Sequence, residues 1–305
     1  MPDNSHPLEI LAAPYTPFHD DGSLDLDGVE PHAAHLARNG IQSVFVNGTT
    51  GECHSLALAE REALARRWIE VTRGAKVRVV VHVGSNCLVD AVALARQAGQ
   101  LGAAGIAAMS PSYFKPRTVA DLVDCAATIA AAAPQTPFYL YDIPSLTGVQ
   151  LSMPDFLSQA RERIPNLVGL KYSNPDLLQF QHLVQADGGR WDIPWGSDES
   201  LLAALALGAR SAVGSTYNFA APVYRRLLAA VGRGDWTAAR HEQFQSARIV
   251  QVLIRHGYLG ASKALMRRMG VPVGPARLPL NNPTPAQEAA LFEDLARAGW
   301  MAGGL

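Results

Sequence analysis

A lysine interrupts an apolar run in the middle of this sequence. The stretch LVGLKYS, residues 167–173, places Lys171 where a buried strand would normally continue with an apolar residue. The chain has 22 arginines but four lysines, so its basic positions are usually arginine. Lysine can lose its proton when burial lowers its pKa, whereas a guanidinium group stays charged. A neutral amine attacks ketones and aldehydes, so Lys171 is a candidate Schiff-base nucleophile. A strand-end lysine that reaches solvent or pairs with a carboxylate is the alternative.

Two further features suit Schiff-base chemistry. Making or breaking a carbon–carbon bond beside an imine requires proton transfer, which the phenol of Tyr141 in the run PFYLYDIP can supply. The turn GTTGE offers backbone N–H groups and the hydroxyls of Thr49 and Thr50 to a substrate carboxylate. A core tyrosine and an ordinary turn are the alternatives. Together with Lys171, these features favour a catalytic site.

These residues need a fold that brings strand ends together. Short β-rich runs alternate with amphipathic or alanine-rich stretches of helical length, which predicts repeated βα units. The eight runs are residues 9–18, 41–48, 77–84, 105–111, 137–144, 167–173, 190–197 and 209–217. We therefore predict an α/β fold, a (β/α)8 TIM barrel over residues 1–233, with a helical C-terminal extension over residues 234–305 packed on the barrel. An open doubly wound sheet is the competing architecture, but no GxGxxG turn follows the first run.

In such a barrel, the chemistry lies at the C-terminal ends of the strands. The expected ends carry many polar residues and no cluster of His, Glu and Asp at ligand spacing, so we predict that no metal binds. Besides Lys171, Tyr141 and the GTTGE turn, these ends carry Tyr113, Asp142, Ser173, Gly196, Asp198, Glu199 and Ser215.

The composition of the chain limits the classes of binding partner that we expect. The chain of 305 residues is 48% hydrophobic and 17% charged, with a net charge of -1, which gives no electrostatic case for nucleic acid or an anionic membrane. A small molecule is the expected partner. Cys53, Cys87 and Cys125 lack C-x-x-C spacing, so neither a disulfide framework nor a zinc site is indicated. The start has no signal-peptide pattern, and no apolar run reaches the roughly 18 residues that span a bilayer, which predicts a cytoplasmic protein.

Three motifs carry a family resemblance in the expected order. GTTGE, YDIPSLTG and GLKYS resemble those of the pyruvate-dependent class I aldolases of the dihydrodipicolinate synthase and N-acetylneuraminate lyase superfamily, and the resemblance covers nearly the whole chain. Within that superfamily, the N-acetylneuraminate lyases are most similar in the segments FKPRT, WGSDESLLAALALGARSAVGSTYN and GVPVGPARLPL.

The resemblance implies a role for each matching residue. Lys171 matches the Schiff-base lysine, Tyr141 the general acid/base, and Thr49 and Thr50 the pair that holds the carboxylate of the pyruvate part. Tyr113 matches a tyrosine that a neighbouring subunit inserts into the site, which implies a homo-oligomer, commonly a homotetramer. Carboxylates and hydroxyls can hydrogen-bond sugar hydroxyls, and glycine allows close approach. The residues implied to hold the polyhydroxy tail are Ser173, Gly196, Asp198, Glu199 and Ser215.

The implied reaction is retro-aldol cleavage of a 2-keto acid, N-acetylneuraminate, to pyruvate and N-acetylmannosamine. No cofactor is expected, because the lysine itself supplies the electron sink. Asp198 and Glu199 also open a helix, where the helix dipole favours carboxylates whether or not a ligand binds. Asp142 stands where many members have asparagine, and two placements are open: beside Tyr141, or pointing away from the site.

Three alternatives to the lyase remain. One is another aldolase, synthase or dehydratase of the superfamily that acts on a different 2-keto sugar acid. Dihydrodipicolinate synthase itself is disfavoured, because those enzymes usually carry an arginine where Leu146 stands here. The second is a non-catalytic barrel that binds sialic acid or a keto acid, which needs neither Lys171 nor Tyr141. The third is a phosphate-binding barrel, which the charges of Asp198 and Glu199 oppose.

Overall fold

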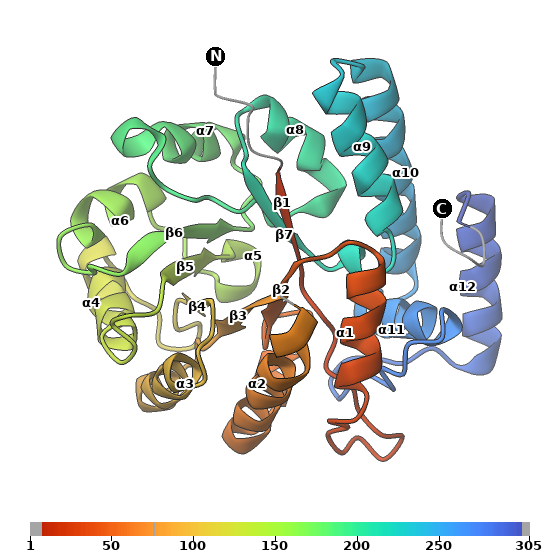
Figure 1. The fold of residues 1–305 in the computed structure, drawn as a ribbon, viewed down its shortest axis with the longest axis horizontal. Helices are drawn as coiled ribbons and strands as arrows, with labels where there is room; N and C mark the ends of the chain where they lie inside the picture. Colours follow the sequence, from red (N-terminus) through yellow and green to blue (C-terminus); the bar gives the residue numbers. More distant parts are fainter. Residues whose placement is uncertain (1–7, 76, 301–305) are drawn as a thin grey trace.

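Seven parallel strands form the centre of the molecule (Figure 1). The structure is a computed structural model that describes residues 8–75 and 77–300. The hydrogen-bonded order of the strands is β6-β5-β4-β3-β2-β1-β7. Strands that are neighbours in sequence therefore pair from β1 to β6, and β1 also pairs with β7. The strands are β1 (Glu9–Ala12), β2 (Ser43–Val46), β3 (Arg78–His82), β4 (Gly105–Met109), β5 (Phe138–Asp142), β6 (Leu167–Tyr172) and β7 (Ser211–Gly214).

The gap between β6 and β7 is bridged by the segment 190–197. The sequence predicted a regular strand here, and that prediction is wrong. The segment instead makes isolated parallel bridges, which include Tyr172 with Trp195 and Trp195 with Ala212. Pro194 has no N–H to donate to a ladder, which accounts for the interruption. The bridges bring the sheet close to closure, so the predicted TIM-barrel fold is confirmed.

Helices cover the outside of the strands (Figure 1). The sequence encodes several of their ends: Thr118 and Asp121 form a reciprocal capping box at the start of α4, for example. The helices up to the last strand and just beyond it are α1 (Val29–Arg38), α2 (Leu58–Thr72), α3 (Leu88–Gln100), α4 (Val119–Ala130), α5 (Pro144–Thr147), α6 (Met153–Ala160), α7 (Leu177–Gln185), α8 (Leu201–Ala206) and α9 (Ala221–Gly232).

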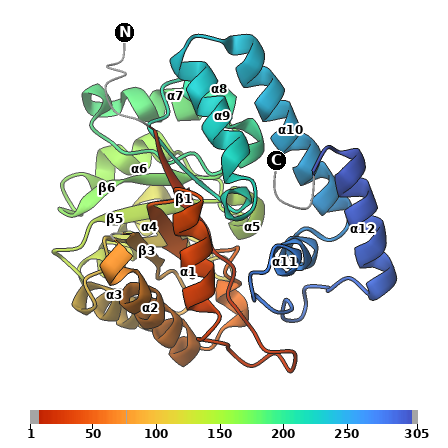
Figure 2. The same ribbon diagram turned by 45° about the vertical axis from the view of Figure 1, so that its right-hand side comes forward.

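Three more helices follow α9 on one flank of the barrel. They are α10 (Trp236–Arg255), α11 (Tyr258–Arg268) and α12 (Pro285–Arg297). Figures 1 and 2 both place α10 beside α9, with α12 on the outside. This part of the chain is helical, as expected, while the predicted domain boundary at residue 233 remains a prediction.

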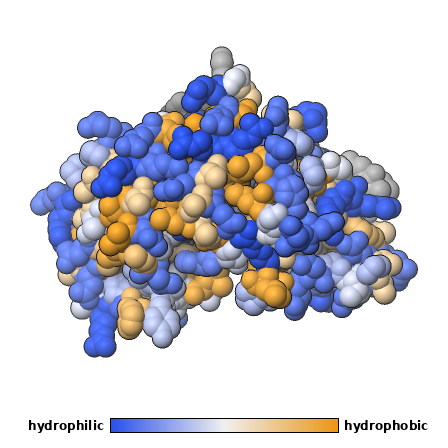
Figure 3. All heavy atoms as spheres, turned by 90° about the horizontal axis from the view of Figure 1, so that it is seen from below, coloured by the Kyte–Doolittle hydropathy of each residue, from blue (hydrophilic) through white to orange (hydrophobic). Residues whose placement is uncertain are grey.

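One face of the molecule is mainly polar. Figure 3 shows a face that is largely hydrophilic, with hydrophobic residues gathered in patches near its middle. Among the described residues, no helix combines the length and apolar character needed to cross a membrane.

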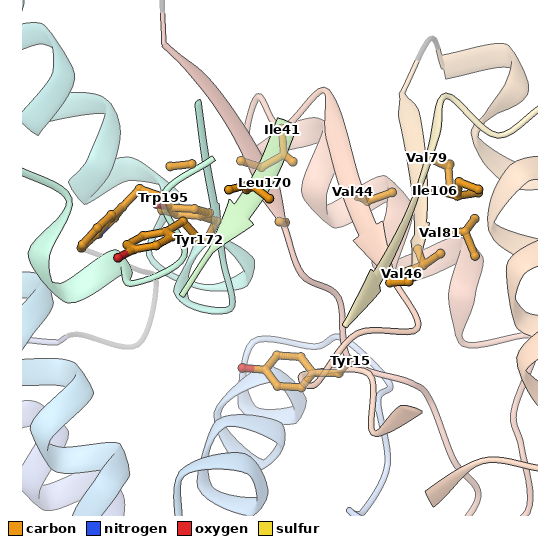
Figure 4. Close-up of a cluster of buried hydrophobic side chains, with 14 of the residues drawn as sticks. Tyr15, Ile41, Val44, Val46, Val79, Val81, Ile106, Leu170, Tyr172 and Trp195 are labelled. Atoms are coloured by element: carbon orange, nitrogen blue, oxygen red, sulfur yellow. The ribbon is translucent and has the colours of Figure 1, made fainter. Parts of the chain in front are cut away.

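Strand alternation divides the core into two layers. Successive side chains of a strand point to opposite faces, so Val44 and Val46 of β2 face the helices while Phe45 faces the barrel interior. Figure 4 shows the helix-facing layer, in which Leu170 and Tyr172 of β6 lie near Trp195. The alternation therefore turns Lys171, the residue between them, into the barrel.

Candidate active site

A cavity of about 610 Å³ opens at the C-terminal ends of the strands. Its volume falls in the range of roughly 300–1,000 Å³ that is typical of small-molecule sites. Most of the predicted site residues line it together: Thr49, Thr50, Tyr141, Lys171, Ser173, Gly196, Asp198 and Ser215.

Lys171 is buried between two aromatic rings at this cavity. Its Nζ lies 3.7 Å from the centre of the Phe45 ring and 3.9 Å from the centre of the Tyr141 ring. Burial lowers the pKa of its ammonium group to about 7, although the negative charge of Asp198 opposes this shift. In a large fraction of the molecules the Lys171 side chain is therefore a neutral amine near neutral pH, which is the form that can attack a carbonyl group.

Tyr141 provides a hydroxyl beside this amine. Burial raises the pKa of its phenol to about 12, and the hydroxyls of Thr49 and Ser173 work against the increase. The Thr49 Oγ1 lies 3.4 Å from the Tyr141 hydroxyl. At neutral pH the phenol is protonated, and two neighbouring hydroxyls are placed to stabilise its anion when it gives up the proton.

The turn after β2 is held firmly. Asn47 and Glu52, at its two ends, have φ angles of 57° and 56°, a left-handed conformation that is uncommon for residues other than glycine. Inside the turn, the carbonyl of Gly51 accepts a hydrogen bond of 2.6 Å from Thr16 Oγ1. These constraints present Thr49 and Thr50 at the wall of the cavity.

Asp198 is fixed by the chain that follows β7. Its Oδ2 accepts hydrogen bonds from the backbone N–H of Thr216 at 2.7 Å and from the Thr216 hydroxyl at 2.5 Å. A Cβ on Gly214 would lie 2.4 Å from the Asp198 carboxyl carbon, so only glycine allows this approach. Burial raises the pKa of the Asp198 carboxyl, while the Thr216 hydrogen bonds and the charge of Lys171 lower it.

Two further polar contacts shape the outer part of the cavity. The Ser173 hydroxyl donates to the carbonyl of Gly196 at 3.4 Å, and a Cβ on Gly196 would clash with that hydroxyl. Ser215 Oγ lies 2.6 Å from the hydroxyl of Tyr258, the first residue of α11. The C-terminal helices thus contribute directly to the site.

Two of the predicted site residues lie outside the cavity. The Tyr113 side chain is 79% exposed and packs edge-on against Phe114, on a loop whose backbone N–H groups donate to Asn86. Glu199 follows Asp198 in a short 3-10 helix, and it is not among the residues of this chain that line the cavity.

Asp142 points away from the catalytic pair. It follows Tyr141 on β5, so strand alternation turns it toward the helices, and its Oδ2 accepts a hydrogen bond of 3.1 Å from Asn174 Nδ2. Burial raises the pKa of its carboxyl to about 6. The Asp142 side chain therefore points away from the site, while its negative charge still contributes to the raised pKa of Tyr141.

Sequence reasoning missed the residues that α11 and the following connector bring to the site. Tyr258, Leu259, Gly260, Pro279, Leu280 and Asn281 all line the cavity. They lie beyond the last strand, where the barrel rule assigns no function. The connector motif GVPVGPARLPL, noted as part of the resemblance, was the available signal.

Within residues 8–75 and 77–300, no group of three or more His, Cys, Asp and Glu residues could hold a metal ion.

The barrel and its site define a member of a known family. Residues 6–298 match the Dihydrodipicolinate synthetase family, and the chain belongs to it.

Among its relatives, the N-acetylneuraminate lyase of Gallus gallus is 38% identical over 275 residues, which cover 89% of each chain. The solved structure of Proteus mirabilis N-acetylneuraminate lyase superposes with a TM-score of 0.93 at 37% identity and covers 96% of this chain and 99% of that one. A DHDPS from Cyanidioschyzon merolae, solved with lysine bound, has a TM-score of 0.88 at 31% identity, with 95% and 98% of the two chains covered. The predicted superfamily is thus confirmed.

Proposed function

We propose that this protein is a Schiff-base aldolase, a carbon–carbon lyase that cleaves N-acetylneuraminate to pyruvate and N-acetylmannosamine. One observation carries the proposal: Lys171, whose pKa is lowered to about 7, packs against Tyr141 at the wall of a cavity large enough for a sugar acid. The choice of substrate is supported by the relatives named N-acetylneuraminate lyase, which are 37–38% identical over most of the chain.

The first half of the reaction forms the imine. The neutral Nζ of Lys171 attacks the ketone carbon of the open-chain substrate, and proton transfer gives a carbinolamine. Tyr141 then donates its proton to the carbinolamine hydroxyl, which leaves as water. The products of this step are an iminium cation and a tyrosinate anion. The faces of the Phe45 and Tyr141 rings, which already contact the lysine nitrogen, stabilise the cation.

The second half breaks the carbon–carbon bond. The tyrosinate removes the proton from the hydroxyl on the far carbon of that bond, so this carbon becomes an aldehyde. The bonding electrons pass into the iminium group, which becomes a neutral enamine. Tyr141 next protonates the enamine carbon, and water adds to the regenerated iminium to release pyruvate and free Lys171. Protons and charges therefore balance with Lys171 and Tyr141 alone.

The cavity orients the substrate for these steps. In this proposal Thr49 and Thr50 hold the carboxylate next to the ketone, a role supported by the position of their turn beside Tyr141. On the other side, Asp198 and Ser215, with Ser173 and the backbone at Gly196, offer hydrogen-bond partners to the hydroxyl-rich tail. Glu199 and Tyr113 remain predicted participants, with Tyr113 acting on a neighbouring subunit.

Leu146 separates this proposal from a dihydrodipicolinate synthase reaction. Its side chain is 60% exposed and lies outside the cavity lining, and it offers no cation to a second substrate carboxylate. The alternative within the family is therefore cleavage of a different 2-keto sugar acid.

We also propose that the protein is a homotetramer and is located in the cytoplasm. An exposed aromatic pair, Tyr113 and Phe114, supports self-association, since large exposed apolar groups often mark interfaces. Size-exclusion chromatography with light scattering tests the tetramer, and cell fractionation tests the location.

Pyruvate release from N-acetylneuraminate, measured with lactate dehydrogenase, tests the function. Wild-type protein should release pyruvate, and Lys171→Ala should not. If the wild type releases no pyruvate, the substrate assignment fails, and a panel of other 2-keto sugar acids distinguishes a sister aldolase from a binding protein.

A further inference from the structure

We propose that Glu52 and Lys263 are positioning residues that hold the carboxylate-binding turn and the outer wall of the cavity at a fixed separation. The inference rests on the proposed function and concerns residues that it does not use. Glu52 closes the GTTGE turn, and Lys263 lies in α11, 211 residues further along the chain. Neither side chain lines the cavity.

The two residues form a fully buried ion pair. Lys263 Nζ donates to Glu52 Oε1 at 3.0 Å, and both side chains have a solvent exposure of 0%. The same nitrogen donates to the carbonyl of Thr16 at 2.9 Å and lies 4.5 Å from the centre of the Phe18 ring. Loss of one partner would leave the other charge buried without compensation, so the pair holds its geometry more strictly than a surface pair does.

On the barrel side, the pair fixes the turn that presents Thr49 and Thr50. The left-handed backbone of Glu52 is unfavourable for a residue with a Cβ and persists only where its surroundings enforce it. The backbone N–H of Glu52 donates to the carbonyl of Thr49 at 3.0 Å. A shift of the Glu52 carboxylate would therefore be passed to the threonine pair.

On the outer side, the same carboxylate holds the wall of the cavity. Glu52 Oε2 accepts a hydrogen bond of 2.8 Å from the backbone N–H of Arg277, and residues 279–281, which follow it, line the cavity. Lys263 belongs to the helix whose first turn provides Tyr258 and Gly260. A Cβ on Gly260 would lie 2.1 Å from the carbonyl oxygen of Asn281, so the connector packs directly on this helix.

One carboxylate thus links the two ends of the site. A substrate that is cleaved must place its carboxylate at the turn, its ketone at Lys171 and its tail at the wall simultaneously. Small displacements of bound groups reduce reaction rates strongly. A buried pair with a structural role alone would affect stability and leave these binding steps unchanged, which provides the basis for a test.

The double variant Glu52→Gln/Lys263→Met removes both charges together and keeps an acceptor for the Arg277 N–H. At a temperature where circular dichroism shows it folded, we expect the pyruvate concentration for half-maximal borohydride trapping to rise at least about fivefold. The KM for N-acetylneuraminate should rise further, because that substrate uses both ends. Glu60→Gln is the control, since it removes the partly exposed ion pair with the Arg277 side chain and leaves Glu52 in place.

Unchanged pyruvate trapping and an unchanged KM in the folded double variant would overturn the inference. If that variant does not fold, Glu52→Gln alone tests the pair, because it removes one charge, keeps the size of the side chain, and leaves Lys263 hydrogen-bonded to the Thr16 carbonyl. It should raise the half-maximal pyruvate concentration in the same direction, and no change would again overturn the inference. Absence of any adduct in the wild type would instead overturn the proposed function.

Discussion

Lys171 Nζ lies 3.9 Å from the centre of the Tyr141 ring, on adjacent strands in which these two residues are direct register partners. The parallel pairing of β5 and β6 brings a nucleophile and a proton donor together on the inner face of the barrel. The same ring can stabilise the cation that the nucleophile becomes during imine formation. The chemistry of the site therefore depends on strand register.

The rate of imine formation should rise with pH through about 7. Below this value the Lys171 ammonium is protonated and cannot attack, and above it the amine is neutral. The initial rate of adduct formation with pyruvate and cyanoborohydride measures this step. Asp198 raises the pKa of Lys171, so Asp198→Asn should move the midpoint to lower pH. Glu70→Gln, which changes an exposed residue of α2, controls for the loss of one charge and should not move the midpoint. A midpoint near 10 in the wild type would contradict this assignment.

Replacing Lys171 should stabilise the fold while it removes activity. Burial lowers the native pKa to about 7, against 10.5 for a free lysine, so the unfolded chain binds this proton more tightly. Burial of Lys171 therefore lowers the free energy of unfolding by its full amount below about pH 7, and by less and less as the pH rises toward 10.5. Lys171→Met should therefore raise the melting temperature by at least about 4 °C near neutral pH, and by less in alkaline buffer.

The control for this experiment is Lys115→Met, which removes an exposed lysine. Its melting temperature should stay close to that of the wild type at both pH values. Destabilisation by Lys171→Met at neutral pH would show that the contacts of the ammonium group outweigh its desolvation.

Tyr141→Phe should slow catalysis strongly while it leaves the equilibrium amount of imine on Lys171 unchanged. The variant keeps the aromatic face and loses the proton donor, so we expect kcat for N-acetylneuraminate cleavage to fall roughly 100-fold or more. The final amount of pyruvate adduct on Lys171 should remain near that of the wild type. Tyr139→Phe is a matched control on the same strand, because its hydroxyl donates instead to Asp192. A Tyr141→Phe enzyme with near wild-type kcat would exclude Tyr141 as the acid/base.

Gly214→Ala should weaken binding of the substrate tail. The new Cβ would lie 2.4 Å from the Asp198 carboxyl carbon and would displace this group from Thr216. Loss of one hydrogen bond to a charged group corresponds to a KM increase of about tenfold. Gly232→Ala is the control, because a Cβ there meets nothing within 4 Å. An unchanged KM for N-acetylneuraminate in Gly214→Ala would show that Asp198 does not bind the tail.

Local sequence patterns predicted much of the barrel and the inner site. The side chains at the ends of β2, β5 and β6 follow from strand alternation together with the barrel rule, which is why Thr49, Tyr141 and Lys171 could be grouped before the fold was known. The segment 190–197 is one of the eight predicted β-rich runs, but it forms isolated bridges and no regular strand, because Pro194 interrupts its ladder.

The contribution of the C-terminal helices could not be predicted in the same way. The contact between Tyr258 and Ser215 joins residues that are 43 positions apart, and the ion pair of Glu52 with Lys263 joins residues 211 positions apart. No local pattern encodes such pairs, because they depend on how α11 packs against the barrel. Buried charges of this kind appear in a sequence as ordinary polar positions on a helix.

Reductive trapping with pyruvate tests the central role of Lys171 most directly. Wild-type protein is incubated with pyruvate and borohydride, digested, and analysed by mass spectrometry beside Lys171→Ala and the surface variant Lys115→Met. One reduced pyruvate adduct on the peptide that contains Lys171, present in the wild type and Lys115→Met and absent from Lys171→Ala, is the expected result. An adduct on another lysine, or none in the wild type, would contradict the assignment of Lys171 as the Schiff-base nucleophile.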